Sequence, residues 1–137
     1  MDLETAEELM SVSLAQCSYL TKTLAEIQER VGLEDAKTYC DAVGQILAWF
    51  LFEVFTPLGQ QFPGVRDWPL QPREWTPDFA RARDREAAFL SISRAVEGTE
   101  RVAAQLSLEG VMREGALPDL KKWTLQCRCF VDSGLAA

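Results

Sequence analysis

Residues 42–52 read Ala-Val-Gly-Gln-Ile-Leu-Ala-Trp-Phe-Leu-Phe and contain no charged side chain. The aromatic-rich run Ile46–Phe55 is also compatible with a strand, but no turn signal occurs between Asp35 and Pro57. The pattern therefore predicts a helix from about residue 35 to 56 that is apolar on nearly all sides and buried at the centre of the fold, with Trp49 in the core. Eleven uncharged residues are too few to cross a membrane, which takes about 18.

The preceding segment carries the clearest periodicity in the chain. Apolar residues recur with alternating steps of three and four from Leu3 to Val31, and only Ser13 interrupts this seam. Such a seam predicts a long amphipathic helix, which Gly32 ends. Because the turn after Gly32 is short, this helix and the helix at 35–56 should form an antiparallel hairpin in which facing residue numbers sum to about 65.

The segment that follows the apolar helix differs in composition. Residues 57–76 carry four of the six prolines together with Trp68 and Trp75. A connection of this length without regular structure is uncommon in a compact domain and often functional. Prolines lower the entropy lost on ordering such a segment, and tryptophans bury large surfaces. We expect an ordered Pro-rich loop that lies over the helices.

The remainder of the chain is predicted to be helical. Thr76 and Pro77 form a helix-start signal for a helix that runs to about Gly98. Gly98 either bends this helix or separates it from a further helix at 99–108. A last helix is expected from Pro118 to Gly134. Together these elements predict that residues 1–137 form a single all-α domain, a bundle of four to six helices around the helix at 35–56.

The cysteines give no support for a metal site or a disulfide. Cys127 and Cys129 lie two apart on a predicted helix, where their side chains point in different directions. In the predicted hairpin Cys17 and Cys40 are separated by roughly 12 Å along the axis, which is too far for a disulfide. We expect reduced, structural thiols, with no metal and no cofactor.

Catalytic motifs are absent from the sequence. The chain has no histidine, no G-x-S-x-G or S-x-x-K motif and no Gly-rich phosphate loop. Acidic residues do pair at helical spacing in three places: Glu4 with Glu7 and Glu8, Glu26 with Glu29, and Glu97 with Glu100. This spacing is similar to that of the E-x-x-E pairs by which helical nucleotide pyrophosphohydrolases of the MazG type hold magnesium. The residues themselves favour solvated acid pairs on exposed helix faces, so no catalytic residue is predicted.

The charge of the chain is unevenly distributed. Residues 1–53 hold ten acidic and three basic side chains, a net of −7, whereas the rest of the chain sums to zero. An acidic side argues against nucleic acid as a partner and favours a protein with a basic surface. The acidic N-terminal residues lack the features of a secretory signal, so a cytoplasmic location is expected.

We therefore expect a small acidic, non-enzymatic protein that binds another macromolecule: an inhibitor, an immunity protein or an anti-defence protein of bacterial or phage origin. A homodimer is also compatible with the sequence. Two alternatives stay open, a magnesium-dependent nucleotide hydrolase that uses the acid pairs and a helical module that binds an apolar ligand. For the favoured reading, the residues expected to steer the partner are Glu4, Glu7, Glu8, Glu26 and Glu29, and those expected to anchor it are Trp68 and Trp75.

Overall fold

The computed structural model describes residues 1–66 and 81–137, and within these ranges every regular element is helical. The four long helices are α1 (Leu3–Val31), α2 (Lys37–Phe50), α6 (Arg85–Leu108) and α7 (Ala116–Ala136). Three short segments continue from α2: the π-helical turn η1 (Leu51–Phe55), α3 (Thr56–Gln61) and α4 (Pro63–Arg66). The prediction of an all-α bundle is confirmed.

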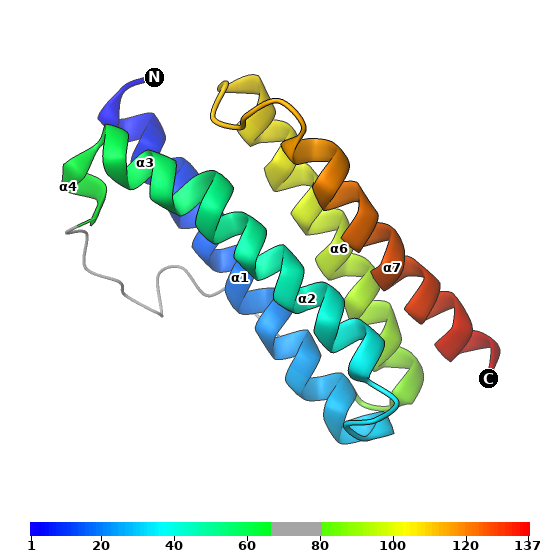
Figure 1. The fold of residues 1–137 in the computed structure, drawn as a ribbon. Helices are drawn as coiled ribbons and strands as arrows, with labels where there is room; N and C mark the ends of the chain where they lie inside the picture. Colours follow the sequence, from blue (N-terminus) through cyan, green and yellow to red (C-terminus); the bar gives the residue numbers. More distant parts are fainter. Residues whose placement is uncertain (67–80) are drawn as a thin grey trace.

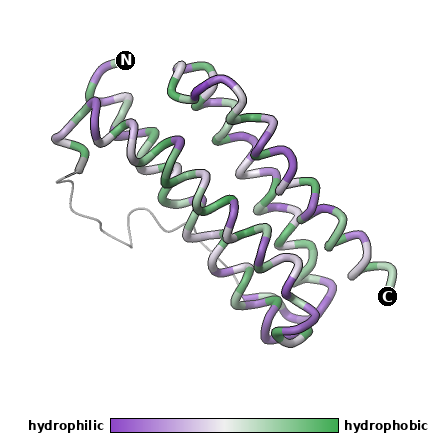
Figure 2. Tube along the Cα trace, in the orientation of Figure 1, coloured by the Kyte–Doolittle hydropathy of each residue, from purple (hydrophilic) through white to green (hydrophobic). Residues whose placement is uncertain are grey.

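The four long helices form two antiparallel hairpins that pack against each other (Figure 1). Helix α1 packs mainly against α6, and α2 packs mainly against α7. Since α2 and α6 run in the same direction, the two hairpins are joined by a crossover connection, one of the standard arrangements of a four-helix bundle. Hydrophilic and hydrophobic residues alternate along each long helix (Figure 2), as they do in helices that bury one side.

The first hairpin is built from local signals that the sequence shows. The side chain of Asp2 accepts a hydrogen bond from the Thr5 amide at 2.9 Å and caps the start of α1. Gly32 follows the end of α1 with a φ of 86°, a backbone conformation that favours glycine. The hydroxyls of Thr23 and Tyr39 lie 2.6 Å apart across the hairpin, close to the predicted register. The predicted antiparallel pairing is confirmed, and Cys17 and Cys40 are free thiols.

Helix α2 differs from the prediction at its C-terminal end, because Pro57 does not stop it. A proline inside a helix lacks an amide hydrogen, and its ring collides with the carbonyl four residues earlier. Here the turn before it widens, and the Thr56 amide bonds to the Leu51 carbonyl, five residues back. The chain then continues as α3 with Pro57 in its first turn, a position that tolerates proline. The first part of the expected Pro-rich loop is thus helical.

The expectation that this helix is covered on every side is wrong. Helix α2 is one of four long helices at comparable positions, so one of its sides faces solvent. Leu51 is 49% exposed and Phe52 is 67% exposed. Trp49, in contrast, is only 4% exposed, and its indole N–H donates to the Ala116 carbonyl at 2.9 Å. Trp49 is therefore a core residue, and it also binds the first residue of α7.

The helical stretch Lys37–Gln61 is long and apolar enough to cross a membrane by length and composition, the one such segment among the described residues. The count of uncharged residues did not show this, because it stopped at Asp41 and Glu53, whereas an 18-residue window with no more than two charged residues meets the criterion. In the bundle 44% of its apolar window is buried, and the core helix of a soluble protein can meet the same criterion of length and composition.

The second hairpin has different boundaries from those predicted. Residues 81–84 are not helical, and α6 begins at Arg85 with the Asp84 carboxylate as its cap, 2.8 Å from the Ala87 amide. The expected start signal at Thr76 and Pro77 lies outside the described residues. Helix α6 continues through Gly98 without a break as far as Leu108. Helix α7 begins at Ala116, before Pro118, and continues past Gly134 to Ala136.

Two of the glycines in these helices mark close contacts between elements. A Cβ at Gly98 would lie 2.6 Å from the Oε1 of Gln16, whose amide donates to the Ala95 carbonyl at 2.7 Å and joins α1 to α6. A Cβ at Gly134 would lie 2.1 Å from the ring of Phe89. Gly134 is therefore required by packing, whereas a Cβ at Gly98 would displace the end of the Gln16 side chain. Neither glycine acts as a helix stop, which is why the sequence misplaced the end of α7.

We predict opposite effects for alanine at two helical glycines. Gly134→Ala forces the buried Phe89 ring to move and should lower the free energy of unfolding by about 1–3 kcal/mol. Gly44→Ala, the matched control, meets no atom within 4 Å and should raise it by roughly 0.5–1 kcal/mol. Urea denaturation of both variants measures the difference, and equal effects would contradict the packing role of Gly134.

Ser13, the single interruption in the apolar seam of α1, is the subject of a second prediction. Its side chain is fully buried, and its hydroxyl has no hydrogen-bond partner among the described residues. Removing an unpaired buried hydroxyl relieves its desolvation cost, so Ser13→Ala should stabilise the fold by about 1 kcal/mol. Thr23→Val, which removes a buried hydroxyl that has two partners, should destabilise it, and thermal denaturation compares the two variants.

Candidate functional site

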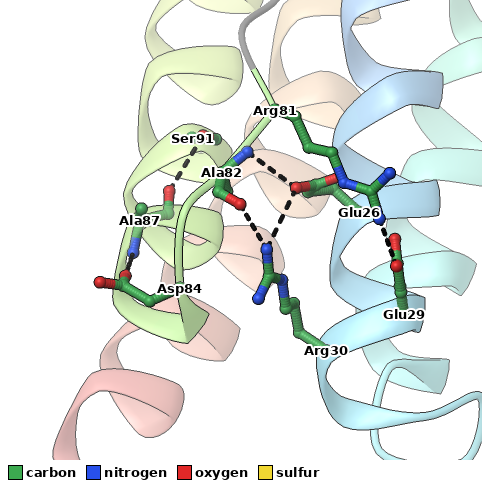
Figure 3. Close-up of polar contacts among 8 residues, drawn as sticks. All are labelled: Glu26, Glu29, Arg30, Arg81, Ala82, Asp84, Ala87 and Ser91. Atoms are coloured by element: carbon green, nitrogen blue, oxygen red, sulfur yellow. Dashed lines mark hydrogen bonds and ion pairs between the residues drawn. The ribbon is translucent and has the colours of Figure 1, made fainter.

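A buried polar group with several partners is the carboxylate of Glu26, near the end of α1 (Figure 3). Its side chain is buried, and Oε1 accepts a hydrogen bond from the Ala82 amide at 2.8 Å. The guanidinium groups of Arg30 and Arg81 each approach it to 3.9 Å. Arg30 also donates to the Ala82 carbonyl, so both backbone groups of Ala82 are bound to α1. We refer to these contacts as the Glu26 latch.

A second acidic side chain extends the latch toward solvent. Glu29, one turn after Glu26, forms an ion pair with Arg81, and both side chains are largely exposed. Exposed ion pairs contribute little to stability, whereas an acceptor inside the fold leaves its donor unpaired when it is removed. The stabilising part of the latch is therefore the buried bond from Ala82 to Glu26, and the pair of Glu29 with Arg81 adds orientation.

These contacts change the role that the sequence predicted for Glu26 and Glu29. Glu26 was expected on an exposed face, where it would steer a partner, but it lies inside the fold and its charge faces two arginines. A signal for this was present, because Thr23 and Ile27, which flank it on the same helical stripe, are both buried. Glu29 remains exposed but already has a partner within the chain.

The remaining predicted site residues fall into two groups. Glu4 and Glu8 are exposed and Glu7 is half-buried on the first turns of α1, as expected for an acidic surface. The neighbouring Asp2 stays ionised at neutral pH, since its bond with the Thr5 amide lowers the pKa of that carboxyl. Trp68 and Trp75, the predicted anchors, lie outside the described residues.

The acid pairs do not converge in the described structure. No group of three or more Asp, Glu or Cys side chains that could hold a metal ion occurs within residues 1–66 and 81–137. Glu100 forms an ion pair with Arg128 of α7, and Glu26 and Glu29 are bound in the latch. The geometry of these residues therefore lends no support to the magnesium-dependent alternative.

An exposed apolar surface on α2 and η1 is the feature that sequence reasoning missed. Its residues are uncharged and at least partly exposed, and they recur at helical spacing: Gly44, Gln45, Ala48, Leu51 and Phe52. We name this set the α2–η1 face. The aromatic cluster at 49–55 was interpreted as core, yet Phe52 points away from it. The spacing gave no signal of this exposure, because Phe52 lies three residues after the buried Trp49, and residues three apart lie on the same side of a helix.

The second hairpin also carries an apolar groove. A depression of about 460 Å³ lies between α6 and α7 and is lined mainly by apolar side chains, among them Ala103, Leu117 and Leu120. Glu100 and Lys121 line it as well. It lies between two neighbouring helices of one hairpin, a position compatible with the alternative of a helical module that binds an apolar ligand between its helices.

Comparisons with family models, with curated proteins and with solved structures found no match to this chain.

We predict that the buried half of the latch is the half that matters for stability. Glu26→Ala leaves the Ala82 amide without its acceptor and should lower the free energy of unfolding by about 1–3 kcal/mol. Glu29→Ala, which removes only an exposed pair, should lower it by less than about 1 kcal/mol. Urea denaturation measures both, and a Glu29 variant as unstable as the Glu26 variant would contradict this assignment.

Proposed function

We propose that this chain is a small non-enzymatic protein that acts by binding another protein, and that the α2–η1 face is the centre of its binding surface. The observation that carries the proposal is the exposed ring of Phe52, 67% accessible, within an uncharged helix face. Large aromatic side chains at the centre of an interface supply much of the binding free energy. An inhibitor or immunity protein of bacterial or phage origin acts in this way, by covering a surface of its target protein.

The geometry of the α2–η1 face supports this role. Leu51 and Phe52 belong to the widened π-helical turn, and such turns occur frequently at functional sites. Behind them, Phe50 is fully buried and packs edge-on against Trp49, with ring centroids 5.2 Å apart. The exposed ring therefore stands on a rigid core, which lowers the entropy lost when a partner covers it.

The charge distribution indicates the chemistry of the partner. Residues 1–53 carry the whole net charge of −7, and they form α1, α2 and part of η1, that is, one hairpin of the bundle. The exposed Glu4 and Glu8 lie at the end of the bundle where α3 lies (Figure 1). A partner with an apolar pocket surrounded by basic side chains is complementary to this hairpin.

The test is capture of partners followed by kinetics with the purified partner. Wild-type protein immobilised and exposed to lysate of the source organism should retain a basic protein, which mass spectrometry identifies. Phe52→Ser should raise the dissociation constant roughly 10- to 150-fold, mainly by faster dissociation, because burial of a Phe side chain contributes about 1.5–3 kcal/mol to the binding free energy. Reversing Glu4, Glu7 and Glu8 to lysine should mainly slow association and flatten its dependence on salt.

Leu108→Ser is the matched control, because Leu108 is an even more exposed apolar residue, 88% accessible, on the other hairpin. Circular dichroism establishes that each variant keeps its helices. The proposal fails if Phe52→Ser and Leu108→Ser bind the purified partner equally, or if the partner that binds has an acidic surface.

A further inference from the structure

A cavity of about 750 Å³ opens at the end of the bundle where α1 and α7 end and α2 and α6 begin. Its volume lies in the range typical of small-molecule sites, about 300–1,000 Å³. It is distant from Phe52, the centre of the α2–η1 face, since fourteen helical positions separate Phe52 from the lining residue Thr38, roughly 21 Å along the axis. It is therefore a second feature of the surface, independent of the proposed protein partner.

Aromatic rings form the apolar part of this cavity. Phe89 of α6 and Phe130 of α7 both line it, with ring centroids 5.3 Å apart. Behind them Tyr39 stacks on Phe130 at 5.6 Å and is fully buried, so the rings are fixed from within the core. A planar apolar group has a matching surface here.

Arg85 supplies a positive charge that is held in place but not neutralised. Its Nη1 donates to the Gly134 carbonyl at 2.7 Å, and its guanidinium carbon lies 4.7 Å above the centre of the Phe89 ring. It forms no ion pair with any acidic side chain of the described residues. The guanidinium therefore keeps donors for an additional acceptor while its position is already fixed.

A second arginine from another helix lines the same cavity. Arg30 donates to the Ala82 carbonyl within the Glu26 latch, yet its buried Nε has no hydrogen-bond partner within residues 1–66 and 81–137. Asp35 is the one acidic side chain among the lining residues, against two arginines. The charges of the lining side chains sum to +1, but Arg30 is already paired with Glu26, so the positive charge without an acidic partner among the described residues is that of Arg85.

We propose that this cavity binds a small organic oxyanion, a carboxylate or a phosphate carried on a planar apolar body. Guanidinium groups form paired, charge-assisted hydrogen bonds with both kinds of oxyanion. The partly exposed ring of Phe130, against which the buried Phe89 ring packs, takes the apolar body, and the hydroxyls of Thr38 and Ser133 lie in the same lining. The pairing of rings with a fixed, uncompensated guanidinium is what distinguishes this cavity from a purely apolar groove.

Cys129 provides a reporter inside the cavity. It lines the site and is exposed, whereas Cys17 and Cys127 lie on the buried side of their helices. Burial raises the pKa of Cys17 and of Cys127 to about 12, so at pH 8 both thiols stay protonated and react slowly. Alkylation of Cys129 by iodoacetamide, followed by peptide mass spectrometry, therefore reads occupancy of the cavity.

The test uses the full chain and four probes: benzoate, phenyl phosphate, inorganic phosphate and the neutral benzyl alcohol. Benzoate or phenyl phosphate should give saturable NMR shifts at the cavity residues and should slow alkylation of Cys129 at least fivefold at saturation. Whichever of these two probes binds more tightly shows whether the cavity prefers a carboxylate or a phosphate. Inorganic phosphate and benzyl alcohol, which each lack one half of the recognised group, should bind at least tenfold more weakly.

Arg85→Gln should weaken binding of the tighter-binding oxyanion probe at least tenfold. Arg101 is an exposed arginine of the same helix outside the cavity, so Arg101→Gln should leave binding unchanged. Ser133→Phe is the second variant, for the case in which Arg85→Gln does not fold. It fills the cavity from an exposed position, leaves both arginines unchanged in sequence and should abolish binding. The proposal is overturned if neither oxyanion binds saturably, if benzyl alcohol binds as well as they do, or if Ser133→Phe binds normally.

Discussion

The buried bond between the Glu26 carboxylate and the Ala82 amide fixes the start of the second hairpin against the first. Helix α6 begins three residues after Ala82, so fixing this residue against α1 also fixes where α6 starts. The later contacts along the same interface, including that of Gln16 with Ala95, then follow at helical intervals. Arg30 and Arg85, which line the cavity at this end of the bundle, lie on either side of the same contact.

The features that the sequence predicted correctly are those fixed by local pattern. The apolar seam of α1, its end at Gly32 and the antiparallel pairing with α2 depend on spacing and on one short turn, and all three agree with the structure. The burial of Trp49 follows for the same reason, because its neighbours have no charge to expose. Periodicity over a long segment averages over many residues, so single exceptions such as Ser13 do not change the result.

The features that failed depend on contacts between distant residues. Proline and glycine were interpreted as helix ends at Pro57 and Gly134, but a widened turn accommodates the first and the ring of Phe89 requires the second. Glu26 was placed at the surface because its partner, Ala82, lies 56 residues later in the chain. The same limit applies to the candidate sites, since neither the exposure of Phe52 nor the meeting of Arg30 and Arg85 is visible until four helices are assembled.

The π-helical turn of η1 is equivalent to adding one residue to an α-helix. From Ile46 the buried positions recur every four residues, at Phe50, Val54 and Leu58, which is longer than the 3.6-residue period of an α-helix. Over three turns the difference grows to about one residue, and the widened turn absorbs it. A deletion of one residue within η1 would therefore rotate the helix beyond it by about 100° and bring a different side chain to the surface. The count of residues in one turn thus determines which side of α3 packs into the bundle.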